Sequence, residues 1–207
     1  MSSLDIQKLL GEHPSSEKIT SHIQSIATSN PLLDIQSPEV KSYPDAVYLN
    51  YFSLGLSLLF KPVNDYKPRF KLRLEDLKDE DLELDGVDLY NNPKPKADES
   101  KSNPAYTTYP VNPFTLNLVS IPDNTRPESM KITPETTGIQ FVETFGEPDR
   151  KGGGAGPSTG SIGIWCEWSR DGIMVEFGGD ESRGPKAWET GKDAVWKVIT
   201  IFPPKIE

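Results

Sequence analysis

The sequence predicts an α+β protein with a mostly antiparallel sheet, one covering helix and further helices near the N-terminus. Two regions place apolar residues at helical spacing, and a short Asp-Gly turn inside another indicates a hairpin. Segments rich in β-branched and aromatic residues indicate the strands. The expected strand regions are 46–60, 86–90, 113–119, 162–177 and 194–202.

The N-terminal 30 residues are predicted to be helical. Leu4, Leu9 and Leu10 suggest a short first helix. In the second, Ile19, His22, Ile23 and Ile26 follow the helical period and give one apolar face. Ser15 or Ser16 suits the N-cap, and Asn30-Pro31 ends the helix.

A later helix is predicted over 134–145. Thr133 is the expected cap, and Pro134 suits the first helical position because that N–H needs no intrahelical partner. Phe141, Val142 and Phe145 form the expected buried face. Gly146 and the proline that soon follows end the segment.

The strand regions are separated by turns and by one long polar segment. Residues 46–52 and 55–60 meet at a turn near Gly55, and Ser169–Gly172 turns the hairpin with Asp171 and Gly172 at positive φ. The strand at 194–202 is expected to pair with that hairpin. Residues 91–103 are expected to form a mobile loop, since they offer little apolar surface to offset the entropy of ordering. The chain shows no repeat of fixed period, and we expect a single domain over 1–207.

Composition narrows the range of partners. The 207 residues include 22 basic and 31 acidic side chains, a formal net charge of −9. Such a chain repels phosphate backbones and anionic headgroups, which argues against nucleic-acid and membrane partners. The N-terminus lacks an apolar signal core, and the single cysteine, Cys166, is typical of a reducing compartment. We therefore expect a cytoplasmic protein.

The region from Lys151 to Phe177 is the strongest candidate for a binding surface, because a glycine-rich loop runs into a tryptophan-bearing hairpin. It does not match a P-loop, since no Gly-Lys-Ser/Thr follows the glycines. Trp165 and Trp168 are expected to point to opposite faces of their strand. Exposed tryptophans are frequent anchors in recognition surfaces. The candidate ligand-binding residues are Arg150, Lys151, Gly152, Gly153, Gly154, Trp165, Trp168 and Trp188.

Catalytic candidates are few. Glu167 and Glu176 lie on the two arms of the hairpin, and paired carboxylates perform acid–base chemistry in glycosidases. Solvent-facing alternation explains them equally well. His13 and His22 stand apart from any convincing nucleophile, and Cys166 suits a packed strand position. No spacing indicates a metal site, and we expect no cofactor.

Three long segments carry a resemblance. They are YLNYFSLGLSLLFKP, TPETTGIQFVETFGEPDRKGGGAGPS and the region from Gly163 to Phe202. Together they resemble a group of cytoplasmic-type proteins of fungi to which no activity is assigned. The resemblance covers most of the chain apart from 91–103, and it implies no catalytic residue.

The residues favour a non-catalytic binding or adaptor protein whose partner is another protein or a small molecule. Two alternatives stay open. One is a hydrolase acting on a sugar or ester through Glu167 and Glu176. The other is a carbohydrate-binding module with a coplanar pair of exposed indoles.

Overall fold

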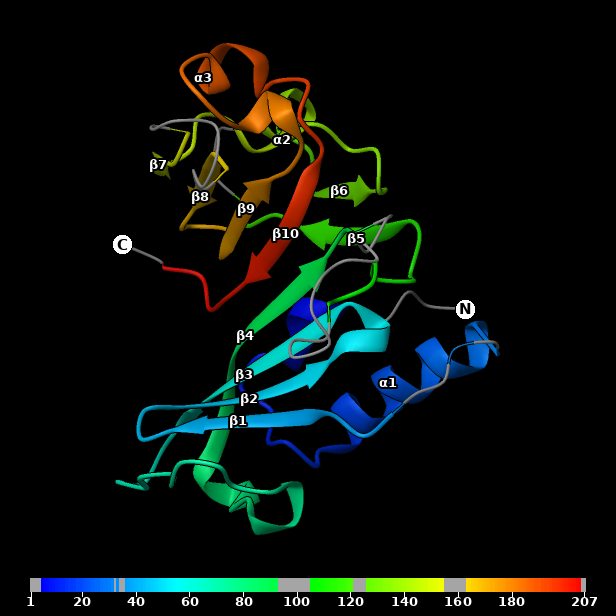
Figure 1. Ribbon diagram of the computed structural model, residues 1–207, viewed down its shortest axis with the longest axis vertical. Helices are drawn as coiled ribbons and strands as arrows, with labels where there is room; N and C mark the ends of the chain where they lie inside the picture. Colours follow the sequence, from blue (N-terminus) through cyan, green and yellow to red (C-terminus); the bar gives the residue numbers. More distant parts are fainter. Residues whose placement is uncertain are drawn as a thin grey trace. The chain divides into compact units, whose positions relative to one another are not determined.

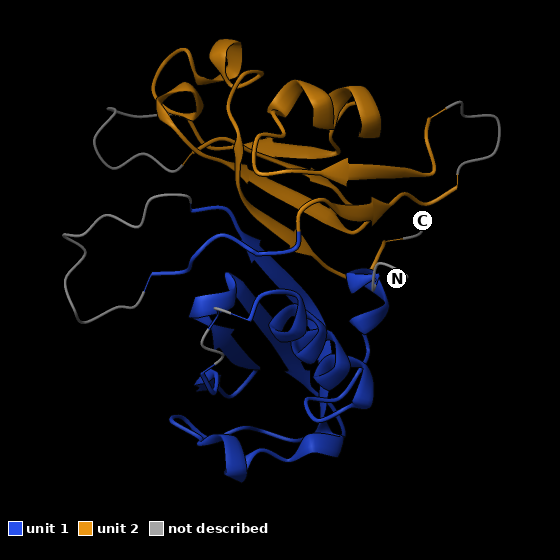
Figure 2. Cartoon of the chain, turned by 90° about the vertical axis from the view of Figure 1, so that its right-hand side faces the viewer, with its two compact units in different colours: residues 1–111 blue, residues 112–207 orange. Residues whose placement is uncertain are grey.

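The computed structural model confirms the α+β class. It describes residues 5–31, 33, 36–92, 105–120, 126–154 and 163–205. The chain divides into two compact units, unit 1 (Met1–Val111) and unit 2 (Asn112–Glu207), which Figure 2 draws in blue and orange. Each unit is described by itself below, and the single domain expected from sequence stays a prediction. Most of the polar segment 91–103, with its expected mobility, lies outside the described residues.

Unit 1 is a helix followed by a four-stranded antiparallel meander (Figure 1). The strands pair in chain order, β1-β2-β3-β4, and each neighbour runs antiparallel. Its elements are the 3-10 helix η1 (Ile6–Leu9), α1 (Glu17–Ser29), β1 (Glu39–Tyr43), β2 (Ala46–Tyr51), η2 (Phe52–Leu54), β3 (Leu56–Pro62), η3 (Leu74–Asp76), η4 (Asp79–Asp81) and β4 (Leu82–Tyr90).

The core of unit 1 lies between α1 and one face of this sheet (Figure 2). Ser16 caps α1 as expected, by accepting a hydrogen bond from the Ile19 N–H. Alternate strand residues are buried because successive side chains point to opposite faces. The buried apolar residues of these elements are Ile19, Ile26, Val47, Leu49, Leu56, Leu58, Phe60, Leu82, Leu84, Val87 and Leu89.

In unit 2, four strands pair antiparallel in the order β10-β9-β8-β7, and β5 and β6 form a separate hairpin. The predicted pairing of the last strand with the Trp-bearing hairpin is confirmed. Its elements are β5 (Phe114–Asn117), β6 (Ser129–Ile132), α2 (Gly138–Phe145), β7 (Arg150–Gly152), β8 (Trp165–Trp168), β9 (Ile173–Phe177), η5 (Asp180–Ser182), α3 (Ala187–Thr190) and β10 (Trp196–Ile201).

The helix α2 covers one face of the unit 2 sheet, as predicted, but it begins later than expected. Phe141 and Phe145 stack with Trp168, and Phe141 also meets Phe177 edge-on. The expected start at Pro134 is wrong. Pro134 and Glu135 instead form a turn, closed by the Thr136 N–H donating to the Thr133 carbonyl, and the Thr136 carbonyl accepts from the Trp196 N–H of β10.

Thr137 is the residue that caps α2. Its N–H donates to the Gln140 side chain at 2.8 Å, so the first turn is closed by a side chain three residues along.

The two units repeat one arrangement of elements. In each, a helix precedes a four-stranded meander, and a four-residue turn joins its second and third strands, with Tyr51 opposite Leu56 and Trp168 opposite Ile173. Each turn ends in a glycine at positive φ, Gly55 at 55° and Gly172 at 66°. The two layouts differ most in their first connection, which is residues 44–45 between β1 and β2 but residues 153–164 between β7 and β8, so matching strands are not separated by one fixed interval.

Finer details of the two meanders also match. In each meander, the residue that follows the last paired residue of the fourth strand donates its N–H to the carbonyl of the turn glycine. The Tyr90 N–H donates to Gly55 at 2.9 Å, and the Phe202 N–H donates to Gly172 at 2.8 Å. The pairing of the third strand with the fourth shifts register once in each unit. The shift lies next to Phe60 in unit 1 and next to Phe177 in unit 2. The repeat therefore extends to hydrogen bonds and strand irregularities.

The structure adds three strands that the sequence did not indicate, β1, β6 and β7. It also corrects one turn residue. Asp171 is not at positive φ, and only Gly172 takes the left-handed conformation in that turn. The Asp171 carboxylate has a different role, described below.

Candidate binding site

A pocket of about 250 Å³ lies in unit 2, beside α2 and α3 and next to the edge strand β7. Its walls are mainly apolar. The eight-residue helix α2 contributes Gly138, Ile139 and Val142 to these walls. The lining residues are Gly138, Ile139, Val142, Glu147, Pro148, Lys151, Ile164, Cys166, Phe177, Trp188, Gly191 and Lys192.

Three glycines allow the pocket walls to approach one another closely. A Cβ on Gly138 would collide with the Gly191 carbonyl oxygen, and a Cβ on Gly191 would lie 2.5 Å from the Ala187 carbonyl oxygen. Gly154 has a φ of +73°, and a Cβ there would lie 2.7 Å from Ile164. These contacts hold the start of α2 and the end of the glycine segment against the α3 region.

The mouth of the pocket carries an aromatic ring and a cation. Trp188 is 48% exposed, and the Lys151 ammonium lies 5.7 Å from its ring centroid. Lys192 and Glu147 also line the pocket. A partner would therefore meet a flat apolar ring beside two ammonium groups and one carboxylate.

Cys166 forms part of the pocket floor. Burial raises the pKa of its thiol to about 11, and the nearby Lys151 offsets this only in part. The thiol therefore stays protonated at neutral pH and packs as a small apolar group.

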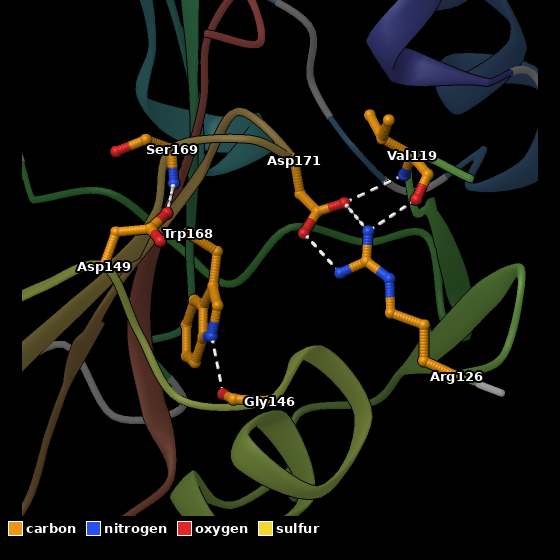
Figure 3. A network of polar contacts seen from close by, with 7 residues as sticks. All are labelled: Val119, Arg126, Gly146, Asp149, Trp168, Ser169 and Asp171. Carbon is orange, nitrogen blue, oxygen red and sulfur yellow. Dashed lines mark hydrogen bonds and ion pairs between the residues drawn. The ribbon is translucent and has the colours of Figure 1, made fainter. Parts of the chain in front are cut away.

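The wall between α2 and β7 is anchored to the hairpin turn (Figure 3). The Trp168 indole N–H donates to the Gly146 carbonyl at 2.8 Å, and the Ser169 N–H donates to the Asp149 carboxylate at 2.7 Å. Gly146 and Asp149 bracket Glu147 and Pro148, which line the pocket. These two bonds fix that segment from both ends.

A buried ion pair holds the other side of the same turn (Figure 3). Arg126 donates to both oxygens of the Asp171 carboxylate, at 2.8 and 2.9 Å. The same carboxylate accepts from the Val119 N–H at 2.8 Å. Because each partner compensates the other's burial, the turn is a rigid support for the hairpin.

The structure brings together some of the predicted binding residues and separates others. Lys151 and Trp188 meet at the pocket. Gly152 lies in β7 beneath the Trp165 ring, and a Cβ there would lie 2.7 Å from that ring. Trp168 packs in the core, so it presents no exposed surface. The two indoles point to opposite faces, as predicted.

The remaining predicted residues at this end lie beside the pocket. Gly153 and Gly154 both have positive φ and carry the chain away from β7. Arg150 faces the other side of the sheet and pairs with Glu167. The rest of the glycine loop, residues 155–162, lies outside the described residues.

Glu167 and Glu176 share one face of the sheet, as the sequence predicted. Their strand partners, Met174 and Trp165, place both on the side opposite Cys166. Glu167 accepts from Arg150 at 3.2 Å and from the Ser169 hydroxyl at 2.6 Å. Glu176 accepts from Lys197 at 2.9 Å.

Each of these carboxylates is thus neutralised by its own partners, and neither is among the described residues that line the pocket. Their acid–base role stays a prediction.

The pocket residues that the sequence did not indicate lie in or next to α2, α3, β8 and β9. Ile139 is the one with a visible signal, since it is an apolar residue on the polar side of a predicted amphipathic helix and is 43% exposed. Gly138, Gly191 and Lys192 carry no comparable signal, because their importance depends on contacts between distant segments.

Across the part of the chain that the structure describes, no helix combines the length and apolar character needed to cross a bilayer. Within the same residues, no group of three or more His, Cys, Asp or Glu side chains is arranged to hold a metal ion. No protein-family model, curated protein or solved structure matches this chain.

Proposed function

We propose that this chain is a non-catalytic binding or adaptor protein, and that the unit 2 pocket takes an apolar side chain from a partner protein. The carrying observation is the half-exposed Trp188 ring beside an apolar cavity, with Lys151 over its face. Exposed tryptophan next to a pocket is the usual composition of an interface hot spot.

The size of the pocket favours a side chain over a whole small molecule. Its volume of about 250 Å³ lies below the range of roughly 300–1,000 Å³ that is typical of small-molecule sites. The two lysines at its edge suit a partner that carries acidic groups beside the inserted apolar residue. A small-molecule ligand is the alternative within the same proposal.

Affinity capture from native lysate, read by mass spectrometry, identifies the partner, and purified components then give its affinity. We expect Trp188→Ala to weaken binding by about 30-fold or more, as truncation of a hot-spot residue does. Phe70→Ala is the matched control, because it removes an exposed aromatic ring from unit 1. Point variants are preferable to deletion of Gly152–Gly154, since these glycines support the walls of the pocket.

The proposal is wrong if Trp188→Ala and Lys151→Ala both retain the partner with wild-type affinity. A pocket-filling variant, Val142→Trp, provides a second test from the opposite direction. The larger side chain fills part of the cavity and leaves the Trp188 ring in place. Loss of binding would therefore locate the contact inside the pocket.

A further inference from the structure

A second hollow of the molecule lies in unit 1, on the face of the strands β1–β4 that points away from the buried core of that unit. Its volume is about 310 Å³. Strand register places Lys41, Tyr48 and Asn50 on the same face as Ser57 and Asp88. The lining residues are Lys41, Tyr43, Tyr48, Asn50, Ser57, Asp88, Tyr90 and Tyr106.

The floor of this hollow is a buried polar pair. Asn50 is 4% exposed and Ser57 is 2% exposed. The Asn50 Oδ1 accepts from the Ser57 hydroxyl at 2.9 Å and from the Tyr106 hydroxyl at 2.7 Å. With its oxygen occupied by two donors, the Asn50 amide is fixed in orientation.

The corresponding strand pair in unit 2 is Glu167 and Met174, where Glu167 is ion-paired. Two uncharged polar residues that bond to each other at this floor are therefore a feature of unit 1. Burying an amide and a hydroxyl is costly unless they are satisfied, and here they form a small network of their own. That network presents polar groups of defined geometry at the base of an open hollow.

The walls are flat rings held in place by stacking. Tyr90 and Tyr106 lie parallel, with centroids 3.7 Å apart and an interplanar angle of 1°. Phe52 also packs against Tyr106, with ring centroids 4.6 Å apart and the rings tilted by 48°. Tyr43 is 43% exposed at the margin and meets Phe70 edge-on, which extends the aromatic surface beyond the hollow.

Two phenols of this surface have raised pKa values. Burial raises the pKa of Tyr48, with Asp88 adding to the shift, and burial also raises the pKa of Tyr106. Lys41 is paired with Glu39 at 3.2 Å. The hollow therefore offers mainly phenol, amide and hydroxyl groups, and the Asp88 carboxylate that also lines it disfavours an anionic ligand such as a phosphate or a carboxylate.

We propose that the open face of the unit 1 sheet binds a neutral saccharide. The C–H faces of a sugar ring pack on the tyrosine rings, and its hydroxyls exchange hydrogen bonds with the Asn50 amide and the phenols. The volume is at the lower end of ligand pockets, which suits a short segment of a chain. The exposed Tyr43 and Phe70 rings continue the surface for neighbouring sugar units.

The test is calorimetric titration of the full chain with maltohexaose, cellohexaose, laminarihexaose and chitohexaose, with decaproline as a comparator for aromatic grooves that recognise extended peptides. We expect at least one saccharide to bind, and decaproline not to bind. Tyr106→Phe keeps the ring and removes one hydroxyl, whereas Tyr43→Ala removes an exposed ring. Each is expected to weaken binding by about tenfold.

Val195→Ala is the control and is expected to bind the saccharide as wild type does, because Val195 is an exposed apolar residue of unit 2 that lines neither hollow. The proposal is overturned if no saccharide binds, if decaproline alone binds, or if both tyrosine variants bind as wild type does. If the near-ultraviolet circular dichroism of Tyr106→Phe shows that its tertiary packing is lost, the test rests on Tyr43→Ala alone. The Tyr43 side chain lies at the surface, so its removal leaves the packing intact.

Discussion

The turns that join the second and third strands of the two units have the same backbone and different anchors. In unit 1 the residue before the turn glycine is Leu54, which is fully buried. In unit 2 it is Asp171, which is buried with Arg126. One position in one layout is thus secured by apolar packing in the first unit and by an ion pair in the second. The backbone arrangement thus determines where the side chain before the turn glycine is placed. It does not determine which interaction stabilises that side chain.

The hollows of the two units also lie at different places in the shared layout. Unit 1 has a 13-residue helix, and its hollow lies on the open face of the sheet. Unit 2 has an eight-residue helix, and its pocket lies beside that helix. On the open face of unit 2, Glu167 and Glu176 engage in ion pairs. The same layout therefore carries hollows at two different places, on the open face in unit 1 and beside the helix in unit 2.

The largest expected effect comes from breaking the ion pair that replaces apolar packing in unit 2. Arg126→Met leaves the Asp171 carboxylate buried without its guanidinium, and we expect a loss of about 4 kcal/mol in the free energy of unfolding. The double variant with Asp171→Leu introduces the apolar anchor of unit 1 and should recover part of that loss, because the Val119 N–H then lacks its carboxylate acceptor. Urea denaturation measures both. Equal destabilisation by the single and double variants would contradict the equivalence of the two turns.

The turn glycines should be almost as sensitive, and equally so in both units. Besides its positive φ, a Cβ at Gly55 would lie 2.7 Å from the Tyr109 nitrogen, and one at Gly172 would collide with the Phe202 carbonyl. We expect Gly55→Ala and Gly172→Ala each to cost between about 3 and 4 kcal/mol.

Gly184 provides the control, since its φ is +80° and a Cβ there meets nothing within 4 Å. Gly184→Ala should cost only about 1 kcal/mol, the penalty of the backbone conformation alone. If all three variants were equally destabilised in urea, close approach at the two turns would play no part in their stability.

A buried histidine should make unit 1 sensitive to acid. Burial lowers the pKa of His22 from 6.5 to about 4, and the Tyr109 hydroxyl lies 3.0 Å from its Nε2. Between these two pH values His22 is protonated in the unfolded chain but stays neutral in the folded protein. The free energy of unfolding is therefore highest above pH 6.5 and falls as the pH decreases toward 4. The full difference amounts to roughly 3 kcal/mol.

Urea titrations across this pH range measure the slope. His22→Gln, which stays neutral throughout, should flatten the decline and leave the remaining pH dependence unchanged. A variant whose stability falls as steeply as that of wild type would show that other groups cause the acid sensitivity.

The smallest expected effects on stability are those of the exposed aromatic residues. Trp188→Ala and Phe70→Ala remove half-exposed or exposed rings, and each should change the free energy of unfolding by less than about 0.5 kcal/mol. Thermal unfolding of the two variants checks this. A large loss in either one would mean that its ring supports the fold and is unsuitable as a binding probe.

Sequence patterns predicted the elements whose own residues carry the periodicity. The hairpin around Gly172, the strand that follows it and the helix after Ser16 belong to this group. The strand Arg150–Gly152 has no apolar residue, and it is a strand only because Trp165–Glu167 lies beside it. No local pattern encodes such a partner.

The candidate site was predictable in part for the same reason. Lys151 and Trp188 stood out because a cation and an exposed aromatic residue near glycines are typical of binding surfaces. The pocket itself depends on the contact between Gly138 and Gly191, which are distant in the sequence. Alternation also placed Trp165 and Trp168 on opposite faces, but only the position of α2 decides that Trp168 is the buried one.

The most direct test of the central proposal compares the affinity of the captured partner for wild type, Trp188→Ala and Phe70→Ala by calorimetric titration. We predict that Phe70→Ala binds as wild type does and that Trp188→Ala binds about 30-fold more weakly or worse. Equal affinity for all three proteins would contradict the assignment of the unit 2 pocket as the binding site.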